Sequence, residues 1–88
     1  MVTVILPRSL VALIPGTERT TEIADAATVA DVIDELDART PGLRNRLVDS
    51  GPTLRQHINV YVDKEPAGLD TPVRPGSTIH VIPAVSGG

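Results

Sequence analysis

The chain has no cysteine, phenylalanine or tryptophan, and Tyr61 is its one aromatic residue. The lack of cysteine excludes disulfides, thiolate metal sites and a thiol nucleophile. The lack of aromatics leaves Val, Ile, Leu and Ala to build the core, which we expect to be thin. No hydrophobic run approaches membrane-spanning length, and the start of the chain lacks a basic segment followed by an apolar one. We therefore expect a cytoplasmic protein that does not associate with membranes.

Charge and length narrow the function further. The formal net charge is −3, and no run of Lys or Arg could follow a phosphate backbone, so nucleic acid is not an expected partner. The 88 residues, 41% of them hydrophobic and 22% charged, suit one soluble globular domain. They leave no room for a separate catalytic domain. A binding or carrier module fits this size better than an enzyme.

The N-terminal third predicts two strands. Residues 2–6 form a short β-branched run that ends at Pro7, which cannot donate to a ladder. An apolar segment over 10–14 leads into Pro15-Gly16, a turn signal, and the Thr-rich run 19–23 follows. The pattern predicts a first hairpin with an irregular connection.

One helix is clear from the sequence. Thr28 can cap its start, and Asp31 three residues later resembles a capping box. Pro41-Gly42 ends it. The apolar residues inside follow the i, i+3, i+4, i+7 spacing of one buried face: Val29, Val32, Ile33 and Leu36.

The second half returns to strands. Residues 43–56 predict a short helical turn and a loop, and 57–63 alternate so that Ile58, Val60 and Val62 face the core. Arg74-Pro75-Gly76-Ser77 suits a type II turn that leads into a last strand over 78–82. The order of elements predicts an α+β protein with a mixed sheet packed on one main helix. A helical crossover would let the terminal strands pair in parallel.

The end of the sequence has a different character. Pro83 should interrupt the ladder, and residues 84–88 (AVSGG) have few bulky groups, so we expect them to project as a flexible tail. Extended, five residues reach roughly 16 Å, enough to enter a narrow channel in another protein. Taken alone, Gly87-Gly88 favours a frayed terminus over a functional tail.

Three segments change that balance, because together they resemble the ThiS/MoaD sulfur-carrier family. The resemblance lies in residues 58–62, in the Pro75-Gly76 turn and in residues 81–88, and the helix segment 28–33 fits it too. It is similar above all to the CysO branch used in cysteine biosynthesis. The resemblance implies a ubiquitin-like β-grasp domain over 1–83 and a C-terminal Gly-Gly tail over 84–88.

The same resemblance implies how the tail works. A ubiquitin-activating-like adenylating enzyme, using ATP and a sulfur donor, would join the Gly88 carboxylate to AMP and replace AMP with sulfur, giving a thiocarboxylate for a sulfur-accepting synthase. Gly88 would be the attachment site, with Gly87, Ser86 and Val85 giving access. An ionised carboxylate attacks a phosphate only where a partner positions ATP, so the chain itself is expected to be a co-substrate that binds no cofactor.

Other functions remain open at this stage. The small subunit of molybdopterin synthase and a ubiquitin-like protein modifier share such tails, and Ser86 departs from the Ala of CysO-type tails. Lys64 is the only lysine, which disfavours a chain-forming modifier. A protease that exposes the terminal Gly-Gly is a further potential partner.

The remaining polar and aromatic residues receive weaker interpretations. His57 and His80 lack the spacing of metal ligands and are expected to be strand or surface histidines. The carboxylates of the helix, including Asp34 and Asp37, suit a solvated face. Tyr61 points away from the core side of its strand, where it would either dock a partner or pack under a loop.

Overall fold

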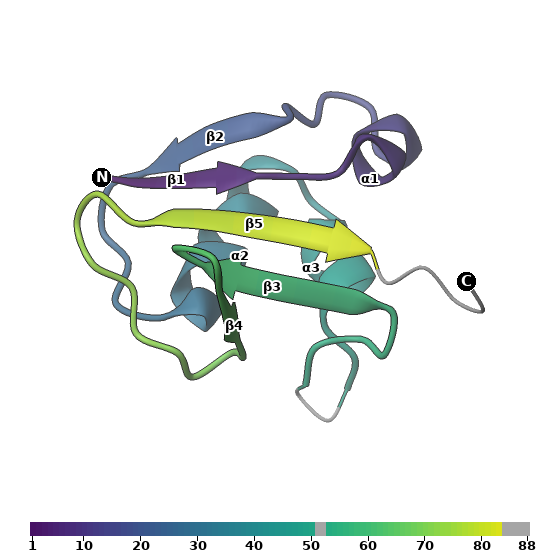
Figure 1. The fold of residues 1–88 in the computed structure, drawn as a ribbon. Helices are drawn as coiled ribbons and strands as arrows, with labels where there is room; N and C mark the ends of the chain where they lie inside the picture. The colour runs from purple at the N-terminus through teal and green to yellow at the C-terminus, as the bar shows by residue number, and fades with distance from the viewer. Residues whose placement is uncertain (51–52, 84–88) are drawn as a thin grey trace.

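The computed structural model describes residues 1–50 and 53–83 as one sheet covered on one face by helices (Figure 1). The eight elements are, in chain order, β1 (Val2–Ile5), α1 (Arg8–Leu13), β2 (Thr20–Ile23), α2 (Val29–Arg39), α3 (Leu43–Leu47), β3 (Ile58–Val62), β4 (Glu65–Ala67) and β5 (Thr78–Pro83). The predicted α+β class and the mixed sheet packed on a main helix are confirmed.

The five strands are ordered β2-β1-β5-β3-β4. β1 pairs with β5 in parallel, while the β1–β2, β3–β5 and β3–β4 pairs are antiparallel. The predicted parallel pairing of the terminal strands is therefore correct. Because α2 lies between β1 and β5 in the sequence, it provides the crossover that a parallel pair requires. β5 occupies the centre of the sheet, with β1 on one side and β3 on the other.

The start of α2 is fixed by the predicted capping box. The Thr28 Oγ1 accepts a hydrogen bond from the Asp31 backbone N–H at 3.3 Å, and Asp31 Oδ2 accepts from the Thr28 N–H at 3.2 Å. These bonds satisfy donors that have no partner within the helix. At the other end, Gly42 adopts a φ of 101°, a left-handed conformation suited to glycine. Asp37 Oδ1 then accepts from the N–H groups of Gly42 and Arg44, both at 3.1 Å, and so holds the start of α3.

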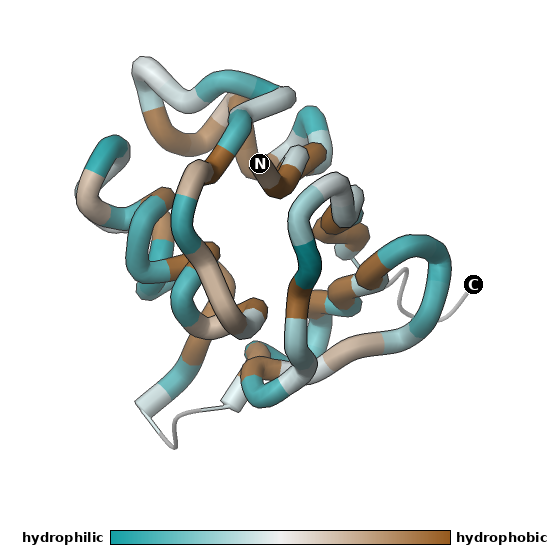
Figure 2. Tube along the Cα trace, turned by 90° about the vertical axis from the view of Figure 1, so that its left-hand side faces the viewer, coloured by the Kyte–Doolittle hydropathy of each residue, from teal (hydrophilic) through white to brown (hydrophobic). Residues whose placement is uncertain are grey.

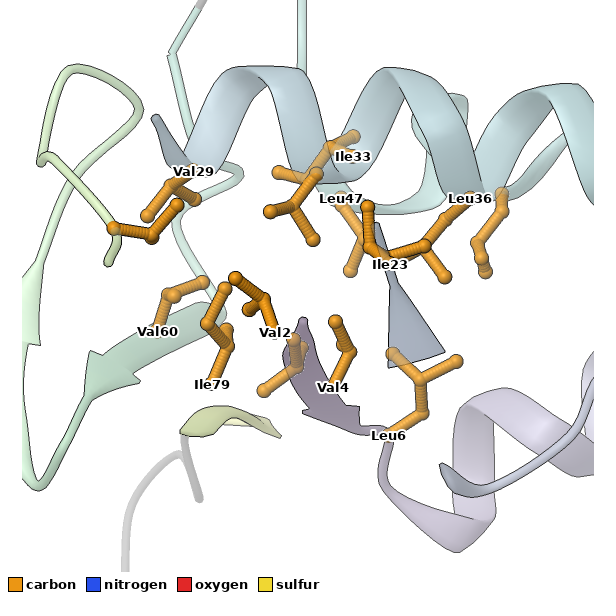
Figure 3. Packing of buried hydrophobic residues seen from close by; sticks show 14 of the residues in the cluster. Val2, Val4, Leu6, Ile23, Val29, Ile33, Leu36, Leu47, Val60 and Ile79 are labelled. Atoms are coloured by element: carbon orange, nitrogen blue, oxygen red, sulfur yellow. The ribbon is translucent and has the colours of Figure 1, made fainter. Parts of the chain in front are cut away.

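The core contains only aliphatic side chains, as the composition predicted. Figure 3 shows the buried face of α2 directed at the inner face of the sheet. Seventeen Val, Leu and Ile residues of the described chain are buried there, and Val4, Ile23 and Leu47 are completely inaccessible. The predicted inward residues of β3 follow this pattern, since Val60 and Val62 are buried and Ile58 packs partly buried against the cluster.

Hydrophobic residues are distributed in short segments along the chain. In Figure 2, which views the molecule from the side of its N-terminus, brown hydrophobic segments alternate with teal hydrophilic ones. The longest helix has 11 residues and carries a charged face. Within residues 1–50 and 53–83, no helix combines the length and the apolar character needed to cross a membrane.

The connection between the first two strands differs from the prediction. The hairpin pairing is correct, but its irregular connection contains the helix α1, which was not predicted. Leu10 is buried, and Val11 and Ile14 pack partly buried against the core. Six residues complete less than two turns, which is too short a window for a helical period to be recognised. Pro7 precedes α1 in an extended conformation and ends β1 as expected.

Burial predicts very different costs for the same substitution at two leucines. Leu47→Ala should lower the free energy of unfolding by about 2–5 kcal/mol, because Leu47 is fully buried and a cavity would remain. Leu13→Ala, at a side chain that is 58% exposed, should lower it by less than about 0.5 kcal/mol. Urea unfolding of both variants measures the difference. Equal losses would contradict the described packing.

Candidate functional site

The tail predicted to carry the chemistry, residues 84–88, directly follows the last described residue, Pro83. Val85, Ser86, Gly87 and Gly88 lie outside the described residues, so their predicted roles remain predictions. Pro83 is the last described residue before them. The structure therefore defines where the tail starts and which surfaces surround that point.

The tail starts from the central strand of the sheet. β5 extends through Pro83, one residue beyond the predicted strand, and Pro83 is the register partner of Ile58 on β3. Pro83 has no N–H to donate, so the ladder loses a donor there although the strand continues. Its neighbour β1 runs parallel to β5, which brings the end of β1 and the following α1 to the same edge (Figure 1). We call this edge the exit edge.

The start of β5 is fixed at the opposite edge. Gly76 has a φ of 89°, and the Ser77 N–H donates to the Arg74 carbonyl at 2.9 Å, as the predicted type II turn requires. The Thr78 N–H donates to Asp63 Oδ1, and the Asp63 N–H donates to the Thr78 carbonyl, both at 2.9 Å. Both ends of β5 are thus tied to neighbouring strands. The tail begins from a rigid support.

The sheet face that the helices leave uncovered carries a small, mostly apolar patch that runs from the β3–β4 turn to Ile82, near the exit edge. Tyr61 is the register partner of His80, and the two side chains line a shallow hollow of about 310 Å³ together with Lys64 and Ile82. Ile82 is 45% exposed, while Tyr61 and His80 are half-buried. We call these four residues the sheet-face patch.

The patch bears on the predicted position of Tyr61. Tyr61 lies opposite the buried Val60 and Val62, as predicted, and it borders an open hollow. Its role in docking stays a prediction. Ile82 and His80 were not assigned to a site from the sequence, although the alternation of β5, with Ile79 and Val81 buried, could have placed both on the outer face.

The histidines occupy the kind of positions that the sequence suggested. His57 is exposed just before β3, and His80 lies on the sheet face. Across residues 1–50 and 53–83, no group of three or more His, Cys, Asp or Glu side chains could hold a metal ion. The described charges also include one ion pair, between Arg44 Nε and Asp34 Oδ1 at 2.9 Å, on an exposed surface.

Comparison with known proteins identifies the fold and the family. The chain superimposes on a chain from the crystal structure of the Amycolatopsis orientalis BexX/CysO complex with a TM-score of 0.85 and 38% identity, and the match covers 100% of both chains. It is 37% identical over 71 residues to the sulfur carrier protein CysO of Mycobacterium tuberculosis, covering 74% of this chain and 76% of that protein. Small archaeal modifier protein 3 of Haloferax volcanii is 34% identical over 70 residues, with 75% of each chain covered.

These likenesses define the protein class as a small ubiquitin-like β-grasp protein of the sulfur-carrier type. Residues 4–88 match the ThiS family, and the chain belongs to that family. The matched range includes residues 84–88 and all of β5, the strand that precedes them. The similarity to CysO predicted from the sequence is confirmed.

The turn that contributes Lys64 to the sheet-face patch holds this lysine in an unfavourable backbone conformation. Asp63 and Lys64 join β3 to β4 with φ values of 49° and 73°, and a lysine has no side-chain bond that favours this left-handed region. Lys64→Gly should therefore raise the free energy of unfolding by about 0.5–1 kcal/mol, measured by urea unfolding. Asp63→Gly serves as the control. It should show no gain, because the Asp63 carboxylate accepts from Thr78; a loss of stability in Lys64→Gly would contradict the assigned turn.

Proposed function

We propose that this chain is a sulfur carrier whose Gly88 carboxylate is converted to a thiocarboxylate and donates sulfur in cysteine biosynthesis or a related pathway. The observation that carries the proposal is the 37% identity to the sulfur carrier protein CysO, over about three quarters of both chains. The superposition on a chain of the BexX/CysO complex, which covers 100% of both chains, supports it.

The chemistry would proceed in two steps on a partner enzyme. A carboxylate oxygen of Gly88 attacks the α-phosphate of ATP, and pyrophosphate leaves, which gives an acyl-adenylate. Hydrosulfide from a sulfide source then attacks the carbonyl carbon and loses its proton, and AMP leaves with the original oxygen, which gives the thiocarboxylate. The chain contributes a nucleophile on a thin arm, and the enzyme supplies the positioning of ATP and the sulfur source. A sulfur-accepting synthase would take the sulfur afterwards.

The surroundings of the tail suit such a partner. The tail reaches about 16 Å from Pro83, so an enzyme that holds Gly88 at its nucleotide has its surface against the exit edge. The sheet-face patch adjoins that edge and offers exposed Ile82 and half-buried Tyr61 for contact. Aromatic and aliphatic side chains of this kind contribute most to binding when a partner covers them. We assign Tyr61 and Ile82 to partner docking.

A second candidate function is the tagging of other proteins. The similarity to small archaeal modifier protein 3 favours it, since that name describes a protein modifier. A modifier would form an isopeptide bond between Gly88 and a lysine of a target instead of a thiocarboxylate. The small subunit of molybdopterin synthase stays a prediction from the sequence alone.

Intact mass distinguishes these functions. Incubation with a cognate adenylating enzyme, ATP and a sulfide source should add the difference between one sulfur and one oxygen to the chain. A variant that lacks Gly87 and Gly88 is the control and should keep its mass, because its terminal carboxylate, now on Ser86, ends two residues short and lacks the narrow Gly-Gly access. A tail-deleted chain that still supports sulfur transfer would refute the carrier role. An unchanged wild-type mass together with adducts on other proteins would favour the modifier.

The patch predicts a binding defect without a chemical one. Ile82→Asp places a charge on the sheet-face patch and should raise the KM of the adenylating enzyme for this chain about fivefold or more, with kcat little changed. Ala38→Asp adds the same charge to the exposed side of α2 in the opposite layer, and should leave KM unchanged. Steady-state pyrophosphate release measures both. Equal changes in KM for the two substitutions would show that the sheet-face patch is not part of the interface.

A further inference from the structure

A groove borders the exit edge on the side away from the sheet-face patch. It lies between α1 and α3, at the start of β3 and the end of β5, and has a volume of about 910 Å³. α1 and α3 lie near the end of β5 in Figure 1. The residues that matter for its chemistry are Leu10, Leu13, Arg46, Arg55, Ile58 and Pro83. The groove is therefore built next to the residue from which the tail starts.

One apolar side chain of the groove, Leu13, is exposed and is not part of the core. Leu10 is 6% exposed and anchors α1 in the core, whereas Leu13, one turn later, is 58% exposed. The large exposed hydrophobic residues of the described chain are Met1, Leu13 and Ile82. Leu13 and Ile82 adjoin the exit edge on its two sides, and Met1 lies at the opposite edge. A partner that holds the tail at this edge would cover both Leu13 and Ile82.

The charge of the groove is opposite to that of the whole protein. The net charge of the chain is −3, yet the groove is lined by Arg46 and Arg55 and by no Asp or Glu. Arg55 Nε donates to the Asn45 carbonyl at 2.6 Å, which fixes that side chain against α3. Arg46 is exposed, and the ion pair described within residues 1–50 and 53–83, Arg44–Asp34, does not involve it. The Arg46 guanidinium is therefore available to form an ion pair with a partner.

We propose that this groove docks an acidic segment of the adenylating enzyme, with an apolar side chain of that segment against Leu13. The inference rests on the proposed function, since the enzyme must lie against the exit edge to hold the tail. Pro83 lines the groove, so a surface that receives the tail also meets Leu13 and Arg46. Complementary charge fixes the orientation of docking and speeds the encounter. The partner would contact the carrier at both the groove and the sheet-face patch, on the two sides of the exit edge.

A competition experiment separates docking from chemistry at the tail. A chain lacking Gly87 and Gly88 cannot be activated, but it keeps the groove and should inhibit thiocarboxylation of the full-length chain competitively. The enzyme used is the one that adds sulfur to the full-length chain, as judged by intact mass. In the tail-deleted chain, Arg46→Glu should raise the inhibition constant about tenfold, and added salt should weaken the parent more than the variant. Leu13→Ser should raise the constant as well.

Arg74→Glu is the matched control. It makes the same charge reversal at an exposed arginine of the turn before β5, at the edge opposite the tail, and should change the inhibition constant less than about twofold. Equal inhibition by the Arg46→Glu and Arg74→Glu chains would overturn the groove proposal. Sedimentation of the wild type as a dimer that Leu13→Ser dissociates would also overturn it, by assigning the groove to a second copy.

The outcomes distinguish the two levels of the proposal. A full-length chain that acquires no sulfur refutes the carrier role and the groove proposal together. A full-length chain that acquires sulfur, with docking unaffected by Arg46→Glu, refutes the groove proposal alone. Circular dichroism of each variant checks that the fold is intact, which is expected because Leu13, Arg46 and Arg74 are all exposed.

Discussion

The parallel pairing of β5 with β1 is the constraint on which the arrangement depends. Thr3, Val4 and Ile5 are in register with Thr78, Ile79 and His80, and the Thr3 N–H donates to the Ser77 carbonyl at 3.0 Å. Two parallel neighbours require a crossover, and α2 provides it while covering the inner face of the sheet. The same pairing brings the ends of both strands to one edge. Pro83, α1 and the groove consequently lie at one edge of the sheet.

The thin aliphatic core is consistent with a protein that leaves catalysis to its partners. Chains of this size have only a few kcal/mol of net stability, and this one reaches it with Val, Leu and Ile alone. Most local devices serve the fold: the Thr28–Asp31 capping box, the Asp37 bonds to the start of α3 and the Asp63 bonds to β5. In the proposed function, the described residues would hold the start of the tail and shape the surface around it.

Much of the fold could be predicted because its signals are local and strong. The capping box with four apolar residues at helical spacing determines α2, and alternation determines β3. α1 is too short for its period to be recognised, and β4 consists of three residues around Pro66, which an edge strand tolerates. The surfaces around the tail were harder to predict. The groove joins Leu13, Arg46 and Pro83, which are distant in sequence and meet only in the folded chain, through the parallel β1–β5 pair and the packing of α3 against α2.

A structure of this chain bound to the adenylating enzyme that the proposed function requires tests the central claim most directly. The claim is that one edge of a rigid sheet presents the tail and that the surfaces on both sides of that edge guide it. The account predicts that Gly88 lies at the α-phosphate of ATP, with the sheet-face patch and the groove both against the enzyme. A complex in which the exposed side of α2 faces the enzyme and the exit edge points to solvent would contradict it.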